Sequence, residues 1–197
     1  AFIPQYPVVS WSNVVWFPRR IPKHSFCLWL TFSDAHKTLD KLHRVGVVQS
    51  DRCVFSCGQE DSVEHLFFAC QFTATIWNHF LALCGYSRCS RGWTEESVWS
   101  VQRLQGPTFN AWITKLSLAA TVYHCWVKRN NRIFNNSFRN CDSLIQIVAS
   151  DIDYKCRGLT RVDDNPTNNA IFANWNLPTR LLSASAATHG GRSWHMQ

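Results

Sequence analysis

The feature that most constrains the fold of this chain is a group of three cysteines and one histidine within residues 53–70. Three residues separate the first two cysteines, and the histidine and the third cysteine lie five positions apart. Three thiolates and one imidazole at such spacings suit a tetrahedral zinc ion, and four protein ligands leave no open position for water. The sequence therefore predicts a structural zinc site formed by Cys53, Cys57, His65 and Cys70.

Two other interpretations of the cysteines are open at the level of sequence. Cys70 follows Leu66, Phe67 and Phe68, so it could be a buried thiol that fills a core. A disulfide between the first two cysteines is the second alternative. We favour the metal because neither alternative explains His65, and because the chain does not start with the basic and apolar segments of a secretion signal.

The segment that carries the histidine raises a geometric problem. Asp61 and Glu64 are spaced like a capping pair and predict a helix that begins near residue 62. His65 and Cys70 would lie roughly 140° apart on an ideal helix and could not both face one ion. Either the first turns are irregular, or Cys70 approaches the ion from the flank. Asp61 or Glu64 could accept a hydrogen bond from the second imidazole nitrogen, and a solvated carboxylate is the alternative for Glu64.

The pattern of apolar residues predicts a mainly α-helical domain built around this small Cys₃His zinc knuckle. Hydrophobic residues make up 46% of the chain and Trp occurs 10 times, which favours a packed core over disorder. Trp11, Val15 and Trp16 are expected to hold the N-terminal arm against that core. Apolar residues at helical spacing predict helices at residues 24–33, 38–46, 62–84, 95–104, 110–135 and 141–158.

These patterns divide the chain into four segments. They are an extended, proline-rich arm (1–22), a zinc-binding helical region (23–109), a C-terminal helical pair (110–160) and a polar, weakly ordered tail (161–197). The tail is expected to be partly disordered, above all in its last fifteen residues.

Several aromatic and basic motifs accompany the cysteines in a fixed order. They are the runs 11–16 (WSNVVW), 22–29 (PKHSFCLW) and 38–42 (TLDKL), the pair Ile76-Trp77, and the run 123–134 (YHCWVKRNNRIF). Over about residues 10–160 this order resembles the zinc-binding region that follows the polymerase in reverse transcriptases of plant LINE-type (non-LTR) retrotransposons. That family usually has two residues between the first two cysteines, whereas here Ser56 is an additional one.

The resemblance implies that an intact parent protein copies element RNA into DNA, and that this piece assists it without catalysis. The piece would bind RNA or DNA, or brace the reverse transcriptase core. The sequence is consistent with a piece that lacks catalysis, since it contains no Gly-rich phosphate-binding loop. The carboxylate pairs Asp163-Asp164 and Glu95-Glu96 lie in polar contexts that do not suit a polymerase metal site. We therefore expect a non-enzymatic module with Zn²⁺ as a structural cofactor.

The net charge of +7 makes an acidic partner plausible, and the basic residues cluster in two places. Residues 51–80 are net acidic, so phosphate would meet the flanks of the knuckle. The basic residues have alternative explanations that need no phosphate. The first cluster could lie in a solvated turn, and the second could lie at a helix C-terminus, where positive charge is favourable. The candidate phosphate contacts are Arg19, Arg20 and Lys23 near the arm, and Lys128, Arg129 and Arg132 near the end of the predicted helix 110–135.

A second functional interpretation is a protein-interaction or scaffold fragment without a nucleic-acid role, and a third is an inert relic of a mobile element. Several of the remaining cysteines are expected to be buried, and the scattered cysteines favour a reducing compartment, hence an intracellular protein, nuclear or cytoplasmic, that is not secreted. No stretch reaches the roughly 20 apolar residues of a membrane span. Because residue 1 is Ala and the only Met is Met196, the chain also resembles a fragment.

Overall fold

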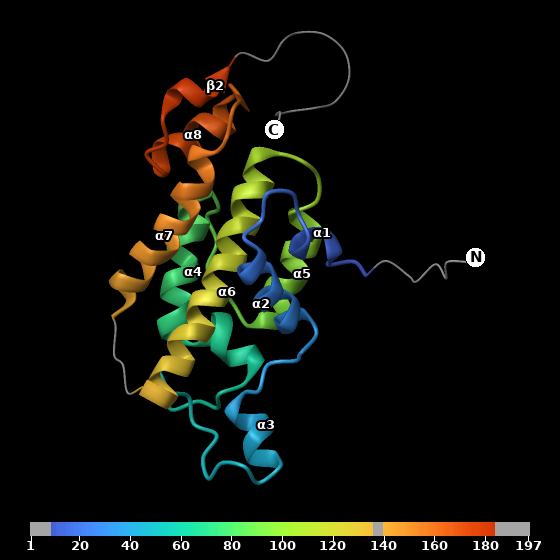
Figure 1. Cartoon of the computed structure of the whole chain (residues 1–197), viewed down its shortest axis with the longest axis vertical. Coiled ribbons are helices and arrows are strands. Elements are labelled where there is room, and N and C mark those ends of the chain that lie inside the picture. The colour runs from blue at the N-terminus through green and yellow to red at the C-terminus, as the bar shows by residue number, and fades with distance from the viewer. Residues whose placement is uncertain (1–8, 136–139, 184–197) are drawn as a thin grey trace, which may run out of the picture.

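The computed structural model describes residues 9–135 and 140–183, and it confirms the predicted mainly helical fold. The long helix α6 lies at the centre, several of the other helices pack around it, and α3 lies apart at one end (Figure 1). In chain order the elements are α1 (Ser12–Val15), α2 (Pro22–Phe32), α3 (Leu39–Arg44), the π-helix η1 (His65–Ala69), α4 (Gln71–Leu83), α5 (Trp93–Arg103), α6 (Phe109–Asn135), α7 (Cys141–Arg157), β1 (Val162–Asp163), α8 (Pro166–Asn174), the 3₁₀ turn η2 (Thr179–Leu181) and β2 (Leu182–Ser183).

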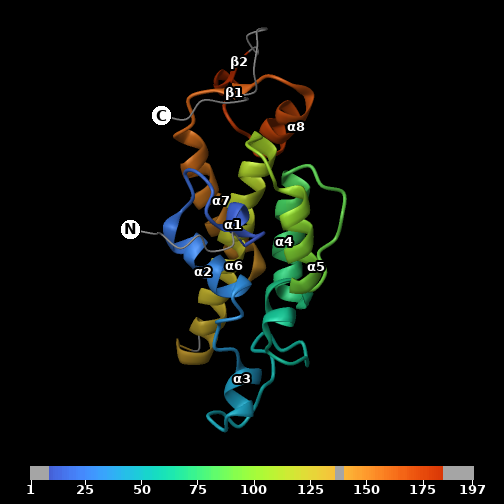
Figure 2. The same cartoon turned by 90° about the vertical axis from the view of Figure 1, so that its right-hand side faces the viewer.

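Helix α6 is 27 residues long and is buried along most of its length. Helices α2, α4 and α7 pack directly against it, as Figure 2 also shows from a second direction. Two buried hydroxyls of α6, those of Thr114 and Ser117, are compatible with this burial because they bond to the backbone of the same helix. The Thr114 hydroxyl donates to the Asn110 carbonyl (2.7 Å) and the Ser117 hydroxyl to the Ile113 carbonyl (2.8 Å).

Local capping explains where several helices start and end. Pro22 occupies the first turn of α2, where its missing N–H costs nothing. The Asn140 side chain accepts a hydrogen bond from the Ser143 N–H and starts α7. Gly85, with φ of 84°, follows the C-terminus of α4. The predicted helices other than 62–84 accordingly lie within a few residues of α2, α3, α5, α6 and α7.

The single helix predicted over residues 62–84 is wrong, because the structure interrupts it at Cys70. The segment consists of η1, then Cys70 in an extended conformation (ψ 129°), and then α4. This interruption places the third cysteine of the Cys₃His group.

The N-terminal arm is more folded than the sequence predicted. Residues 1–8 lie outside the described part, and the residues after them form the short helix α1. Trp11 stacks on Phe32 with ring centroids 5.4 Å apart, as expected for an anchor. Trp16, however, is 43% exposed, and Phe17 is buried instead. The Trp112 indole N–H of α6 donates to the Pro18 carbonyl (3.0 Å) and also holds the arm.

The C-terminal segment also differs from the prediction over residues 161–183, where a weakly ordered tail was expected. Strands β1 and β2 pair in parallel, with Val162 opposite Leu182, and α8 lies between them. Phe172 of α8 is buried, and its ring centroid lies 5.3 Å from that of Phe109 in α6. Residues 184–197, which contain the part predicted to be disordered, lie outside the described residues.

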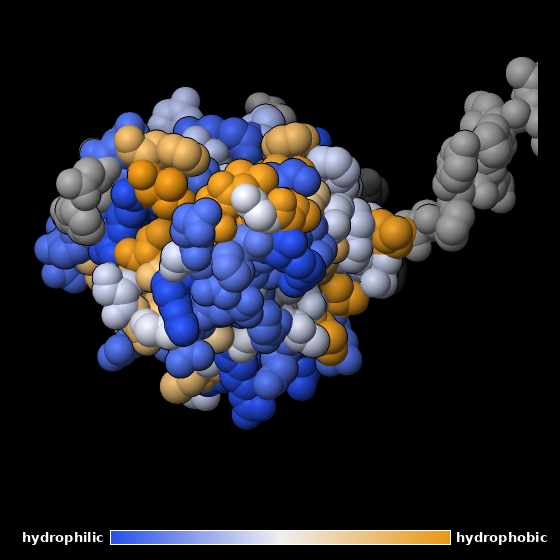
Figure 3. Space-filling view, turned by 90° about the horizontal axis from the view of Figure 1, so that it is seen from below, coloured by the Kyte–Doolittle hydropathy of each residue, from blue (hydrophilic) through white to orange (hydrophobic). Residues whose placement is uncertain are grey.

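One cluster of buried side chains runs from Val14 to Leu177 and includes residues from all four predicted segments. Seen from the end that carries α3, hydrophilic residues cover much of the surface and hydrophobic residues gather in separate patches (Figure 3). In the described part of the chain, no helix combines the length and the apolar character that crossing a membrane requires.

Candidate metal centre

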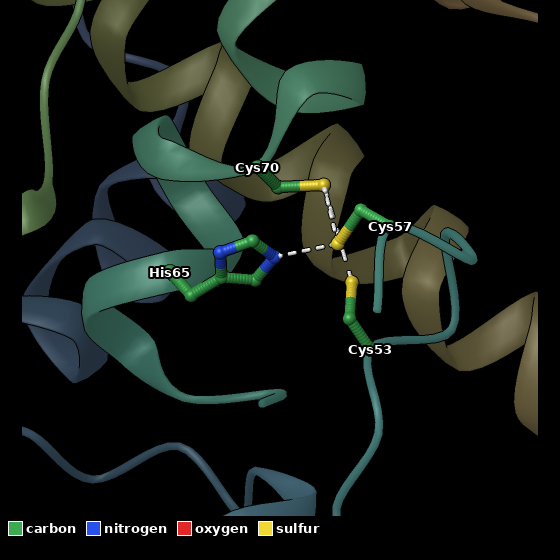
Figure 4. A group of neighbouring side chains, drawn as sticks. All are labelled: Cys53, Cys57, His65 and Cys70. Atoms are coloured by element: carbon green, nitrogen blue, oxygen red, sulfur yellow. Dashed lines mark hydrogen bonds between the residues drawn. The ribbon is translucent and has the colours of Figure 1, made fainter. Parts of the chain in front are cut away.

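The structure brings the four predicted ligands together. The sulfur atoms of Cys53, Cys57 and Cys70 and a nitrogen of His65 all lie within 4.8 Å of one another, and Figure 4 shows these atoms pointing toward a common centre. Cys70 Sγ lies 3.9 Å from Cys53 Sγ and 3.9 Å from Cys57 Sγ. Tetrahedral zinc with Zn–S bonds of about 2.3 Å holds its sulfurs about 3.8 Å apart. The group could therefore hold a metal ion without a large rearrangement.

The first two cysteines lie on a loop that is closed at its base. Arg52 and Glu60 form an antiparallel bridge, and the Cys53 N–H donates to the Gln59 carbonyl (2.8 Å). Within the loop, Ser56 and Gly58 both have left-handed backbones, with φ of 61° and 81°. The left-handed backbone of Ser56 adds a bend to the loop, so this additional residue fits between the two cysteines and the sulfurs still converge.

The π-helix η1 solves the geometric problem of the other two ligands. Its hydrogen bonds join residues five apart, and the Cys70 N–H donates to the His65 carbonyl (2.8 Å). Residues five apart lie roughly 140° from each other on an α-helix, whereas the wider turn of a π-helix brings them closer to the same side. His65 and Cys70 therefore face the same side. Of the two possibilities left open by the sequence, the irregular first turns are confirmed.

The two acidic residues near His65 have other roles than those predicted. Asp61 Oδ1 accepts a hydrogen bond from the Leu39 N–H (2.9 Å) at the start of α3. Glu64 Oε2 accepts one from the Thr94 N–H (2.8 Å) in the first turn of α5. Each carboxylate thus stabilises the start of a distant helix. Neither caps η1, since the Ser62 hydroxyl accepts from the His65 N–H instead (3.2 Å).

Burial and thiol contacts set the electrostatics of the group. Cys53 and Cys70 are buried, and Cys57 and His65 are half-buried. A hydrogen bond from the Cys53 thiol lowers the pKa of Cys70 to about 5 and raises the pKa of Cys53. This hydrogen bond thus favours the thiolate form of Cys70, which is the form that binds a cation.

The other buried cysteines differ from this group. Burial raises the pKa of each of four thiols, which suits the predicted role of inert core fillers. They are Cys27, Cys84, Cys125 and Cys156.

Arg132 of α6 supports the cysteine loop in a way that the sequence did not predict. Its guanidinium donates to the Val54 carbonyl (2.9 Å). It also lies over the rings of Phe55 and Phe72, at 4.7 and 5.1 Å from their centroids. These two rings stack on each other at 4.4 Å. Arg132 thus links the loop to α6 through packing and a hydrogen bond.

The predicted basic strip on α6 does not lie on the surface. Arg129 is 2% exposed and its guanidinium pairs with the buried Asp61. Lys128 is also buried, at 3% exposure. The helical pattern could not reveal this, because the acidic partner of Arg129 lies in a distant part of the chain.

The three basic residues near the arm remain at the surface. Lys23 is exposed, with its ammonium 5.0 Å from the ring centroid of Tyr123. Arg20 is half-buried and lies 5.3 Å from the ring centroid of Trp16. Arg19 donates a hydrogen bond to the Gly158 carbonyl.

Comparison with known proteins gives one finding. Searches of curated proteins and of solved structures returned no significant match. Residues 1–77, however, match a protein-family model described as zinc-binding in reverse transcriptase. The matched stretch contains all four residues of the Cys₃His group. Over residues 1–77, this chain is therefore similar to the zinc-binding region of reverse transcriptases.

Proposed function

We propose that this chain is a non-catalytic zinc-binding module of a reverse transcriptase from a plant LINE-type (non-LTR) retrotransposon. Cys53, Cys57, His65 and Cys70 would hold one structural Zn²⁺. The convergence of these four ligand atoms, inside the stretch that matches the reverse transcriptase family, carries the proposal. Three soft thiolates and one imidazole form a donor set that suits zinc and completes its coordination.

The ion would hold together two segments that have little regular structure of their own. The loop of residues 52–60 has one backbone bridge at its base, and η1 is a short, irregular helix. A zinc ion bound to both would fix the loop against the helical core, since binding free energy becomes folding free energy at such sites.

The surface around Trp16 supports the proposal of a role beside the polymerase. Single strands bind where aromatic rings stack on bases and nearby cations attract the phosphates. Trp16 is 43% exposed, Arg20 lies against its ring, and Lys23 is exposed at the start of α2. A hollow of about 270 Å³ beside Trp16 also includes Lys115 in its lining. We propose that this surface contacts single-stranded template or target nucleic acid in the parent protein, while other faces brace the polymerase core.

The metal assignment is tested by elemental analysis of the purified full chain. We expect at least one zinc per chain, and we expect Cys57→Ser to lose one equivalent. Cys89→Ser is the matched control, since Cys89 is exposed and lies outside the group. A folded chain without bound zinc, or full zinc content in Cys57→Ser, would refute the assignment.

The nucleic-acid role is tested by single-stranded RNA binding across a range of salt concentrations. Phosphate contacts make affinity fall with salt, and each lost contact should reduce the slope by about 0.7. Arg20→Gln and Lys23→Gln should each do so, and Trp16→Ala should weaken binding without changing the slope. Arg157→Gln, an exposed cation on α7, serves as control. No binding even at low salt would favour a protein-interaction or scaffold role.

A further inference from the structure

A second cluster of potential metal ligands lies among three helices. It consists of His24 from α2, His124 from α6 and Asp151 from α7, whose ligand atoms all lie within 4.8 Å of one another. Asp151 Oδ2 is 2.7 Å from His124 Nε2 and 3.4 Å from His24 Nε2. These residues are far apart in the sequence, so only the packing of α2 and α7 against α6 brings them together (Figure 1).

His24 is the unusual member of this cluster. Its side chain is fully buried, yet neither ring nitrogen has a hydrogen-bond partner among the described residues. Its Nε2 faces the Asp151 carboxylate without forming a hydrogen bond to it. Buried polar atoms without partners are uncommon because their desolvation is not compensated, and coordination of an ion would compensate it.

We propose that His24, His124 and Asp151 form a second metal site, which binds a divalent transition ion such as Zn²⁺. Two imidazoles and one carboxylate are a common donor set for such ions. With three protein ligands, the site would keep at least one position for water, unlike the Cys₃His group.

The protonation states of the two histidines suit this role. Burial, and then the neighbouring His124, lower the pKa of His24 to about 3. Burial also lowers the pKa of His124. Both imidazoles are therefore neutral at physiological pH, which metal coordination requires.

The surroundings give the ion access and set its affinity. The side chain of Asp151 is 33% exposed and lines a surface hollow with Ser143 and Ser150, so an ion could enter from the α7 side. The positive charges of Lys23 and Lys155 act on His24 and oppose a cation. We therefore expect weaker binding here than at the Cys₃His group, where a thiolate is already favoured.

Cobalt titration of the full chain distinguishes the two sites. Cobalt bound by Cys₃His gives thiolate-to-metal charge-transfer absorption, and cobalt bound by two imidazoles and a carboxylate does not. We expect the first equivalent to give this absorption and a second equivalent to bind without adding to it. Asp151→Asn and His124→Gln should weaken the second equivalent at least tenfold and leave the first unchanged. Asp153→Asn on the same helix is the matched control, since Asp153 pairs with Arg157.

These outcomes test the second metal site independently of the Cys₃His site in the proposed function. A folded chain that binds a single equivalent would mean that His124 and Asp151 form only a structural hydrogen bond, and the second site would be rejected. Undiminished binding of the second equivalent in Asp151→Asn would reject it as well. The charge-transfer band shows whether each variant is folded at the Cys₃His group. If a variant loses this band, the imidazole NMR signals of the unaltered chain test the second site instead. The signals of His24 and His124 should shift only with the second equivalent of Zn²⁺.

Discussion

Asp61 and Arg129 form a bidentate ion pair inside the protein, although 68 positions separate them in the sequence. Arg129 Nη2 lies 2.8 Å from Asp61 Oδ1, and its Nε lies 3.2 Å from Oδ2. Asp61 also accepts the Leu39 N–H at the start of α3. One buried carboxylate therefore links α3, the end of the cysteine loop and α6. Together with Arg132, this connection holds the loop of the candidate metal site against the core.

Replacing Asp61 with Asn should destabilise the fold strongly. The buried guanidinium of Arg129 would lose its counter-charge, and breaking a buried pair from one side costs about 3–5 kcal/mol. Urea unfolding, followed by far-UV circular dichroism with zinc present, would measure the change in the free energy of unfolding. Arg157→Gln is the control, because that exposed pair with Asp153 should contribute less than about 1 kcal/mol. Equal effects of the two substitutions would contradict the role given to the buried pair.

Cys70→Ser should destabilise the chain only through the metal. Cys70 joins η1 to α4, so loss of the ion would free the segment that leads into the central helices. If the ion contributes about 3 kcal/mol, the Tm of the zinc-loaded protein should fall by roughly 6–12 °C. Differential scanning calorimetry with and without a chelator would test this.

The chelated proteins provide the control for that experiment. Without metal, the unaltered chain and Cys70→Ser should unfold at similar temperatures, because a serine hydroxyl replaces the thiol with little change in shape. If chelation leaves the difference between the two proteins unchanged in size, Cys70 stabilises the core by packing and not through the metal.

Glu96 should matter for stability far more than its neighbour Glu95. Glu96 is buried and accepts hydrogen bonds from the Trp77 indole (3.0 Å) and from the guanidinium of Arg88 (2.6 and 2.7 Å). Glu96→Gln should cost about 2 kcal/mol, since hydrogen bonds to charged groups are stronger than neutral ones. Glu95 is exposed and pairs with Arg91, an exposed residue just before α5, so Glu95→Gln should change stability by less than about 0.5 kcal/mol.

Parallel urea titrations of the two variants provide a matched comparison at adjacent positions. From sequence alone, both residues are expected in a polar, weakly ordered context. A similarly small loss in both variants would support that expectation and contradict the buried network around Glu96.

The ligand set and the positions of most helices could be predicted from the sequence because both leave a local signal. Cys and His at metal-binding spacing are visible without a fold, and apolar residues at helical spacing mark α2, α6 and α7. The break at Cys70 was visible only as a contradiction, since an ideal helix could not aim His65 and Cys70 at one ion. That contradiction left two possibilities, an irregular turn or an approach of Cys70 from the flank, and it could neither choose between them nor identify the π-helix.

The errors involve partners that are distant in the sequence. Arg129 resembles any cation near a helix C-terminus until the fold places Asp61 beside it. The segment after residue 160 is polar in composition, and a few apolar contacts such as Phe172 with Phe109 are enough to fold it. Composition averages over a segment and therefore underestimates such isolated anchors.

The buried His36 should make the stability of the fold depend on pH. Its Nε2 lies 3.0 Å from the Thr31 hydroxyl, its ring packs on Trp126, and burial lowers its pKa from 6.5 to about 4. Between these two values the unfolded chain binds a proton that the folded chain does not, so the free energy of unfolding falls as the pH falls from 6.5 toward 4. The difference between the two pKa values corresponds to roughly 3 kcal/mol, and above pH 6.5 His36 should have no effect on the slope.

Urea unfolding at several pH values between 4 and 8, with zinc removed by a chelator, would isolate this effect from proton competition at the thiolates. His36→Gln should have a shallower loss of stability below pH 6.5 than the unaltered chain. Part of the slope should remain, because burial also lowers the pKa values of His24 and His124. His43→Gln, at a side chain that is 49% exposed, should keep the full slope. If His36→Gln keeps it as well, the imidazole of His36 must already be protonated or hydrated in the folded chain, and its assignment as a neutral core residue fails.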